Sequence, residues 1–414
     1  MEPRVGPRAI GNGMSARVYV FCLLCSFSAL NVFILFSSYN ASGSTAVAEL
    51  GSEPPIDRSD YLRVSALSKE IEQMKKQHSK FRDETNDKLH ALEDKINDTL
   101  ATRNRILKVH LWDDSTLPNG YREKKLYSVE GFTNHPRTQL VLSADDADLI
   151  VWATVRGNTE AEVPPSDYSN VVVIDYADGC SAHQKRNELK HMIGYFKRSF
   201  VSRNEHSLYE GNCTSEPVEG GVFPFAYSGL KAIVNKDIEK ERSTLITNVL
   251  RTEYDHNTVR ARIVNWTSAF IERNDLKHNS LVGEKGHGYS SSDFDDAYLL
   301  HLADSKIIVT CNPWRWEGDF RLWEALLSGA LVFVDIMAIP QWMPNPFVHK
   351  KHLIYYDTTN QTEFDSLLRY YIDHEDEAKA IGKAGYNFVL EHHMAEDRVS
   401  YILDKIEDRI VFDG

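Results

Sequence analysis

The pattern of hydrophobic and polar positions is clearest between residues 306 and 335, where it predicts a compact βαβ unit. An apolar run rich in Ile and Val, Lys306–Thr310, predicts a strand. Phe320–Leu327 has the pattern of a short helix, and Ser328-Gly329 then leads into a second apolar run, Ala330–Val334. A strand, a helix and a strand within about thirty residues are typical of a parallel sheet.

Similar alternation on both sides of this unit predicts an α/β fold with two domains, at residues 106–240 and 241–414. In the first domain we expect strands at 106–112, 139–142, 148–153 and 171–174 and a helix at 184–198. In the second we expect further strands at 243–250, 281–283 and 353–356, and helices at 255–272, before 303, at 363–374 and at 376–409. The charged connector between them, 236–242, is helix-prone.

The first 36 residues predict a membrane anchor. The run 18–36 is apolar and contains no charged residue, and such a length can span a thin bilayer. Three arginines precede it, so residues 1–17 are expected to form a cytosolic tail. A cleaved signal peptide is the alternative, although the apolar core of such peptides is typically about 7–15 residues. We therefore expect a single-pass type II protein of the Golgi or ER membrane, with the rest of the chain in the lumen.

A heptad pattern in residues 37–105 predicts a stem that contains a coiled coil. Residues that are apolar, or that a coiled-coil seam tolerates, recur at spacings that alternate between three and four: Val64, Leu67, Ile71, Met74, His78 and Phe81. The pattern slips near 85–88 and resumes with Leu89, Leu92, Ile96 and Leu100. One stutter in a coiled coil explains this slip, and we expect the stem to join two copies into a homodimer. A single charged helix is the alternative.

The net charge argues against one class of partner, while the sequons and cysteines agree with a lumenal protein. A net charge of −13 argues against nucleic acid as a partner, because phosphate binding needs basic clusters. N-glycosylation is predicted at Asn40, Asn97, Asn212, Asn265 and Asn360. In an oxidising lumen we expect a disulfide between Cys180 and Cys213, which leaves Cys311 without a partner.

Charged residues gather at the start of the predicted helix 320–327. Arg321 and Glu324 are three apart, so they share one helix face. A helix N-terminus attracts phosphate, and an Arg there adds bidentate donors. A carboxylate one turn further along can accept hydrogen bonds from ribose hydroxyls. This set suits a nucleotide sugar, and the alternative is a surface ion pair.

These residues also resemble a known motif. The order of Arg321, Glu324-Ala-Leu and Ser-Gly-Ala before an apolar strand resembles the donor site of GT-B glycosyltransferases, in particular the exostosin-like family and the bacterial spore-maturation type. The resemblance covers about residues 244–398. It implies two Rossmann-like domains facing a cleft, with Arg321 beside the donor diphosphate and Glu324 on the ribose. Glu317 and Glu324 are separated by six residues, one fewer than in many enzymes of this fold.

The remaining candidates complete the predicted site. Glu317, Gly318, Asp319, Phe320 and Gly283 are further donor-binding candidates. Asp175 and Asp178 follow a buried strand and are the best candidates for the general base, with His135 and His183 as weaker ones and a strand-end turn as the alternative. Further groups that could face an anion or the nucleotide are Lys197, Arg198, Arg251, Arg260, Lys285 and His287.

We expect no metal and no cofactor besides the nucleotide sugar, because Arg321 and helix amides would stabilise the departing diphosphate. Asp293 and Asp295 match a metal-binding Asp-x-Asp, but helix capping explains them equally well. The predicted activity is the transfer of a sugar to a glycan or glycoprotein acceptor. The alternatives are a non-catalytic lectin-like or scaffold protein tethered by its coiled coil, and a lumenal sulfotransferase.

Overall fold

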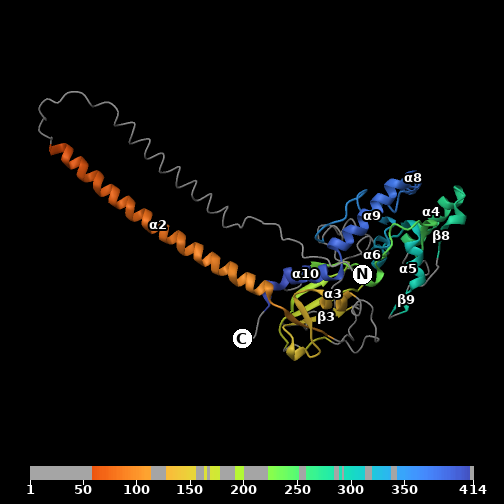
Figure 1. The fold of residues 1–414 in the computed structure, drawn as a ribbon, viewed down its shortest axis with the longest axis horizontal. Helices are drawn as coiled ribbons and strands as arrows, with labels where there is room; N and C mark the ends of the chain where they lie inside the picture. Colours follow the sequence, from red (N-terminus) through yellow and green to blue (C-terminus); the bar gives the residue numbers. More distant parts are fainter. Residues whose placement is uncertain are drawn as a thin grey trace, which may run out of the picture. The chain divides into compact units, whose positions relative to one another are not determined.

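Figure 1 shows the chain in a computed structural model. The structure describes residues 58–112, 127–154, 163–165, 168–177, 192–199, 222–250, 258–283, 289–290, 293–312, 319–336 and 343–410. The chain divides into two compact units, Met1–Ala91 and Leu92–Gly414.

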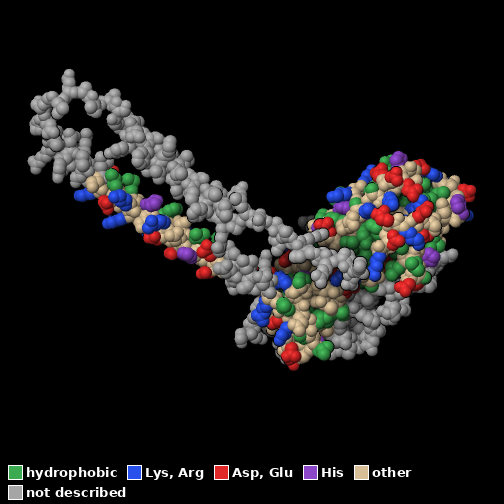
Figure 2. Space-filling model, viewed as in Figure 1, with side chains coloured by type: hydrophobic (Ala, Val, Ile, Leu, Met, Phe, Trp, Pro, Cys, Tyr) green, Lys and Arg blue, Asp and Glu red, His purple; other side chains and the backbone are tan. Residues whose placement is uncertain are grey.

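A single long helix, α2 (Arg58–Asn104), runs through most of the described part of the stem and continues into the second unit. Its 47 residues include neither Gly nor Pro, so nothing in the sequence interrupts its hydrogen bonds. Hydrophobic side chains and charges of both signs follow one another along it (Figure 2). A single copy of the helix does not test whether two copies pair, so the coiled coil and the homodimer stay predictions.

The first sheet of the second unit is wholly parallel and has the order β2-β1-β3-β4-β5-β6. Its strands are β1 (Leu107–Leu111), β2 (Thr138–Leu140), β3 (Leu149–Thr154), β4 (Val171–Asp175), β5 (Met192–Lys197) and β6 (Val222–Pro224). The middle strands β3 and β4 are buried at every position, as expected for parallel strands covered on both faces. The short helix α3 (Val129–Asn134) precedes β2.

Two predicted helical segments are wrong. The helix expected at 184–198 is replaced over Met192–Lys197 by the strand β5, while residues 184–191 lie outside the described ones. β5 pairs with β4 and β6, and an added Cβ at Gly194 would lie 2.8 Å from Ile406. Strand pairing and close packing therefore override the local preference of this segment for a helix. The connector 236–242 forms turns and no helix.

The second sheet is also parallel, in the order β13-β12-β11-β7-β8. Its strands are β7 (Thr244–Asn248), β8 (Ser280–Val282), β11 (Ser305–Val309), β12 (Leu331–Asp335) and β13 (Ile354–Tyr356). The described helices of this half include α4 (Thr258–Arg273), α5 (Asp296–Ala303), α6 (Phe320–Leu327), α8 (Gln361–Asp373) and α9 (Glu375–His392). A two-stranded antiparallel ribbon, β9 (Tyr289–Ser290) and β10 (Asp293–Phe294), precedes α5.

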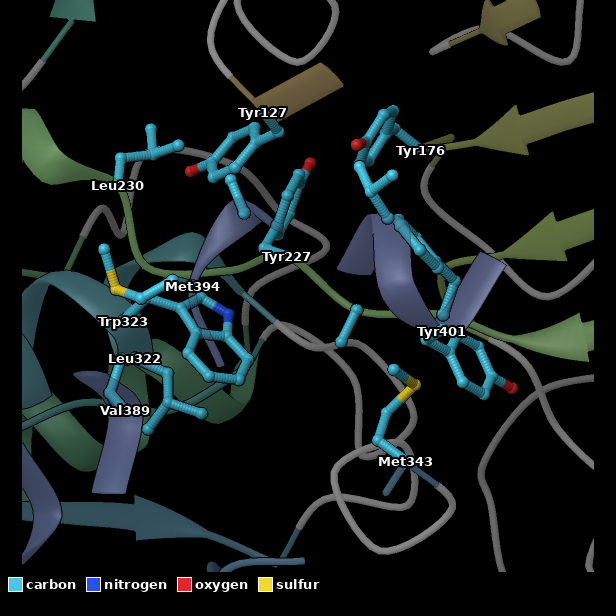
Figure 3. Packing of buried hydrophobic residues seen from close by; sticks show 14 of the residues in the cluster. Tyr127, Tyr176, Tyr227, Leu230, Leu322, Trp323, Met343, Val389, Met394 and Tyr401 are labelled. Atoms are coloured by element: carbon cyan, nitrogen blue, oxygen red, sulfur yellow. The ribbon is translucent and has the colours of Figure 1, made fainter. Parts of the chain in front are cut away.

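The last helix, α10 (Ala395–Ile406), packs against α3 and β5 of the first sheet (Figure 1). The ring of Tyr401 meets that of Phe196 edge to face at 5.9 Å. Gly131 of α3 lies so close to α10 that a Cβ there would be 2.8 Å from the carbonyl oxygen of Ala395. One hydrophobic cluster includes residues of both halves, and Figure 3 shows part of it around Tyr227 and Trp323.

The carboxyl ends of the two sheets meet at aromatic side chains. Tyr176 follows β4 and Tyr227 follows β6, and their rings stack at 5.5 Å. Tyr227 in turn contacts Phe320, the first residue of α6, with 5.9 Å between the ring centroids. The start of α6 therefore lies against the first half of the unit.

Several sequence predictions fall outside the described residues. These are the apolar run 18–36, the sequons Asn40 and Asn212 and both members of the predicted disulfide, Cys180 and Cys213. Among the helices that the structure does describe, none is both long enough and apolar enough to cross a bilayer. Asn97 lies in α2, Asn265 and Asn360 are exposed, and Cys311 is a buried free thiol.

Two buried histidines make the fold sensitive to acid. Burial, together with nearby cations and other histidines, lowers the pKa of His352 to about 4 and that of His393 to about 2. Below pH 6.5 the unfolded chain protonates these rings and the folded chain does not. Each histidine should then remove about 1.4 kcal/mol of unfolding free energy per pH unit, down to its folded-state pKa.

We predict that the unfolding midpoint of the wild-type chain falls between pH 6.5 and pH 5 more than that of His393→Gln. The comparison isolates this ring because other titrating groups contribute to both proteins. The exposed His278→Gln is the matched control and should follow the wild type. Equal slopes for wild type and His393→Gln would contradict the assignment.

Candidate functional site

The candidate site lies where β11 ends and α6 begins, at the carboxyl edge of the second sheet. Asp319 caps α6, and its carboxylate accepts a hydrogen bond from the backbone N–H of Arg321 at 3.3 Å. The side chains of Leu322–Leu327 are all buried, which holds the helix on the sheet. The chain leaves the helix through Gly329, whose positive φ of 81° favours glycine.

Two guanidinium groups meet on the Asp319 carboxylate. Arg260 of α4 donates to Oδ2 at 2.5 Å and Arg321 of α6 donates to the same oxygen at 2.7 Å. Burial alone would raise the pKa of Asp319, but the two arginines outweigh it and lower the pKa to about 2. The carboxylate is therefore charged, and the three side chains carry one net positive charge.

A hydrogen-bonded support lies behind this cluster. The side-chain oxygen of Asn312 accepts from the backbone N–H of Asp319 at 2.7 Å. The backbone and side-chain nitrogens of Asn312 both donate to Oδ1 of Asp335, at 2.9 and 3.0 Å. Burial raises the pKa of Asp335 to about 7, and its Oδ2 has no hydrogen-bond partner among the described residues. Asn312 thus links the end of β12 to the start of α6.

Glu324 lies one turn along α6 and is 1% exposed. Tyr298 of α5 donates a hydrogen bond to its Oε2 at 3.3 Å. Glu324 also lines a pocket of about 440 Å³ bounded by residues 232–236, α5 and α6. A second pocket, of about 250 Å³, lies at the amino ends of β7, β11 and β12 and is far from this chemistry.

The cluster is suited to an anion. Each arginine reaches Asp319 through one terminal nitrogen, and the buried Nε of Arg260 has no partner among the described residues. The N-terminus of α6 adds backbone N–H groups and a favourable dipole for negative charge. A phosphate group would find guanidinium donors and helix amides together.

On the first sheet, Asp175 ends β4 in a closed environment. Its carboxylate is 3.4 Å from the ammonium of Lys197, and it accepts hydrogen bonds from Tyr195 and from the backbone of Ala177. Both charged side chains are only 1% exposed. This geometry favours a buried ion pair over contact with an acceptor hydroxyl. Lys197 lies in β5 and not at a solvated helix end, while Arg198 packs over the ring of Tyr227.

The other predicted residues are distributed as follows. Gly283 follows β8 with a φ of 99°, and an added Cβ would contact none of the described residues. Asp295 caps α5 by accepting from the backbone of Ala297 and Tyr298, which agrees with the capping alternative. His135 is buried and hydrogen-bonded to Ser400. Asp178, His183, Arg251, Lys285, His287, Glu317 and Gly318 lie outside the described residues.

The structure adds three polar residues that sequence reasoning did not identify, namely Tyr298, Asn312 and Asp335. Asn312 lies shortly after β11, and Asp335 is the last residue of β12. A search for polar residues at strand ends could therefore have indicated both. Tyr298 lies within an apolar helix, and only the packing of α5 on α6 brings its hydroxyl to Glu324.

Residues 270–404 match the model of a family described as glycosyl transferase-like. The matched region begins in α4 and ends in α10, so it contains Asp319, Arg321 and Glu324. The chain therefore carries a glycosyl transferase-like domain. The match does not separate the exostosin-like family from the spore-maturation type. No curated protein matches the chain in sequence.

Solved structures similar to the chain include a glycosyltransferase from Rickettsia africae ESF-5, with 10% identity over 75% of this chain and 100% of that one and a TM-score of 0.47. An alpha-glucosyltransferase solved with UDP-glucose and DNA has 10% identity over 72% and 99%, with a TM-score of 0.46. Anabaena Alr3699/HepE, solved with UDP and glucose, has 10% identity over 73% and 100%, with a TM-score of 0.42.

We predict that Asp319→Asn destabilises the second unit by about 3 kcal/mol, because it leaves two buried guanidiniums without their counter-charge. Thermal unfolding of the purified chain measures this. The control is Asp365→Asn, which breaks the exposed pair with Arg273 and should cost no more than about 1 kcal/mol. If the two variants unfold at the same temperature, the buried cluster is not what stabilises this edge.

Proposed function

We propose that this chain is a glycosyltransferase of the GT-B type that transfers a sugar from a nucleoside diphosphate donor to a glycan or glycoprotein. The observation that carries the proposal is the pair of guanidiniums, Arg260 and Arg321, held at the N-terminus of α6 by Asp319. The glycosyl transferase-like match includes Arg321 and Asp319, which supports the proposal. The contact between Tyr227 and Phe320 supports a site at the junction of the two sheets.

In this proposal the arginines act on the leaving group. As the bond between the sugar and the diphosphate breaks, negative charge develops on the departing phosphate oxygen. Guanidiniums fixed in advance by Asp319 stabilise that charge without having to reorganise. Because they supply the positive charge, the reaction would not require a divalent ion. Activity that persists in excess EDTA is the corresponding expectation.

Glu324 takes the ribose in the same arrangement. Its carboxylate accepts a hydrogen bond from Tyr298, and each oxygen of a carboxylate can accept more than one hydrogen bond. Two ribose hydroxyls could donate to it while the diphosphate lies one turn earlier on α6. The pocket between α5, α6 and residues 232–236 provides space beside this side chain.

The general base that removes the acceptor proton is proposed to be Asp178, three residues beyond the end of β4. Asp175 is the second choice, because Lys197 and Tyr195 already occupy its carboxylate. A base in this segment would come from the first sheet, whereas the donor contacts come from the second. The two substrates would then meet between the sheets.

We predict that Glu324→Gln raises the KM for the donor roughly tenfold to a hundredfold, since hydrogen bonds to a charged acceptor contribute about 1.5–3 kcal/mol. The test is hydrolysis or transfer with a panel of UDP- and GDP-sugars. Gln keeps an acceptor for Tyr298, so the fold should survive. The control is Glu375→Gln, because Glu375 begins α9 and, among the described residues, forms only an exposed ion pair with Lys306 of β11.

A wild-type donor KM in Glu324→Gln would remove Glu324 from the ribose site. Failure of every nucleotide sugar to bind the wild-type chain would instead favour the non-catalytic tethered protein.

We also propose that the chain resides in the Golgi or ER membrane with this site in the lumen, on the strength of the apolar run 18–36 and the sequons. Glycans at Asn265 and Asn360 agree with the exposure of both residues. Thr267, the third residue of the sequon at Asn265, is buried, and its hydroxyl accepts a hydrogen bond from Asn248 at 2.8 Å. That threonine thus has a structural role of its own.

We predict that an endoglycosidase lowers the apparent mass of the chain made in eukaryotic cells, and that Asn265→Gln and Asn360→Gln each remove part of this shift. The asparagines are substituted because a change at Thr267 would also break a buried hydrogen bond. An unchanged mass after digestion would contradict the lumenal location.

A further inference from the structure

α2 exposes a strip of apolar side chains. Ile71, Met74, Phe81, Leu89 and Leu92 are between 40% and 69% exposed. Together with His78 and Thr85 they recur at intervals of three and four residues, so they lie along one side of the helix. Large apolar groups in such a strip are stabilised when another surface covers them.

Exposure is not confined to the strip. The side chains described between Ala66 and Asp94 are all exposed except that of Glu93, which is half-buried. Helices gain most of their stability from packing an amphipathic face and little from propensity. A helix of 47 residues with an uncovered apolar strip therefore indicates a partner.

We propose that this strip pairs with the same strip of a second copy of the chain in a parallel, in-register, two-stranded coiled coil. Ile71, His78 and Thr85 then take the a positions, and Met74 and Phe81 take the d positions. A β-branched residue at a, as at Ile71, favours two strands. This proposal does not depend on the proposed activity.

The charges beside the strip select the parallel orientation. Glu70, Gln77 and Glu84 occupy g positions, and Lys75 and Arg82 occupy e positions. In a parallel pair each g residue faces the e residue five places later in the partner, so Glu70 meets Lys75 of the second copy twice. In an antiparallel pair e faces e and g faces g, which brings like charges together.

The ion pairs within one helix leave these groups available. Among the described side chains Glu70 forms no ion pair, and Lys75 makes an exposed contact with Glu72 at 3.4 Å. Such a contact contributes little to stability, so its exchange for a contact across the interface costs little.

His78 selects the register. An in-register pair places the two imidazoles opposite each other in one polar layer. A shift by one heptad would place His78 opposite Ile71 or Thr85 of the second copy, so a polar ring would lie against an aliphatic side chain in one of those layers. Polar residues at a positions of coiled coils specify register in this way.

Cysteine cross-linking of the full-length chain in isolated membranes tests the geometry. Each a residue meets its own copy in a parallel, in-register pair, so Ile71→Cys should form a reducible dimer under mild oxidation well above the wild-type level. The control is Lys76→Cys, at an f position that points away from the partner, and it should give no increase over wild type. Met74→Cys repeats the test at a d position and covers the case in which one substitution weakens pairing.

Charge exchange tests the orientation. Glu70→Lys and Lys75→Glu should each lower the Ile71→Cys cross-linking yield severalfold at low salt, because each puts like charges opposite one another. The double exchange should restore the yield, because the pairs re-form with their signs reversed.

A lack of cross-linking at both Ile71→Cys and Met74→Cys would overturn the proposal. Equal cross-linking at Lys76→Cys, or a double exchange that fails to restore the yield, would each do the same.

Discussion

The contact between Asp319 and the guanidiniums of Arg260 and Arg321 is the constraint on which the carboxyl edge of the second sheet depends. Removing one partner from a buried charge cluster is strongly destabilising, because it leaves an uncompensated buried charge. Here α4 supplies one arginine, α6 supplies the other, and the loop after β11 supplies the carboxylate, so three elements must pack in one arrangement. The excess positive charge at the start of α6 follows from that arrangement, and it is what an anionic ligand would meet.

The rest of the unit holds this edge in place. Asn312 carries the hydrogen bonds from Asp319 to Asp335 and so joins the ends of β11 and β12. On the other side, Arg398 of α10 is buried, donates to the carbonyl oxygen of Tyr227 at 3.1 Å and lies over the ring of Trp323 in α6. The segment after β6, the terminal helix and α6 therefore pack as one body, and the ring of Tyr227 reaches Phe320.

Sequence alone predicted most of this frame but only part of the site. α6 has the predicted bounds, Phe320–Leu327, because its apolar positions recur at helical spacing and Asp319 and Gly329 mark its ends. β5 was missed because Met192–Lys197 is short and follows a charged, helix-prone stretch, and its pairing is visible only in three dimensions. Arg260 is 59 residues from Asp319, and Tyr298 is 26 residues from Glu324. Spacing along a helix identifies neighbours such as Arg321 and Glu324, but it carries no information about contacts between helices.

The most direct test is an experimental structure of the chain with an intact nucleotide sugar bound. We expect the diphosphate within hydrogen-bond distance of Arg321 and Arg260 at the N-terminus of α6, with the ribose hydroxyls on Glu324. A nucleotide bound at the amino ends of β7, β11 and β12, or one bound with both arginines turned away from its phosphates, would contradict it.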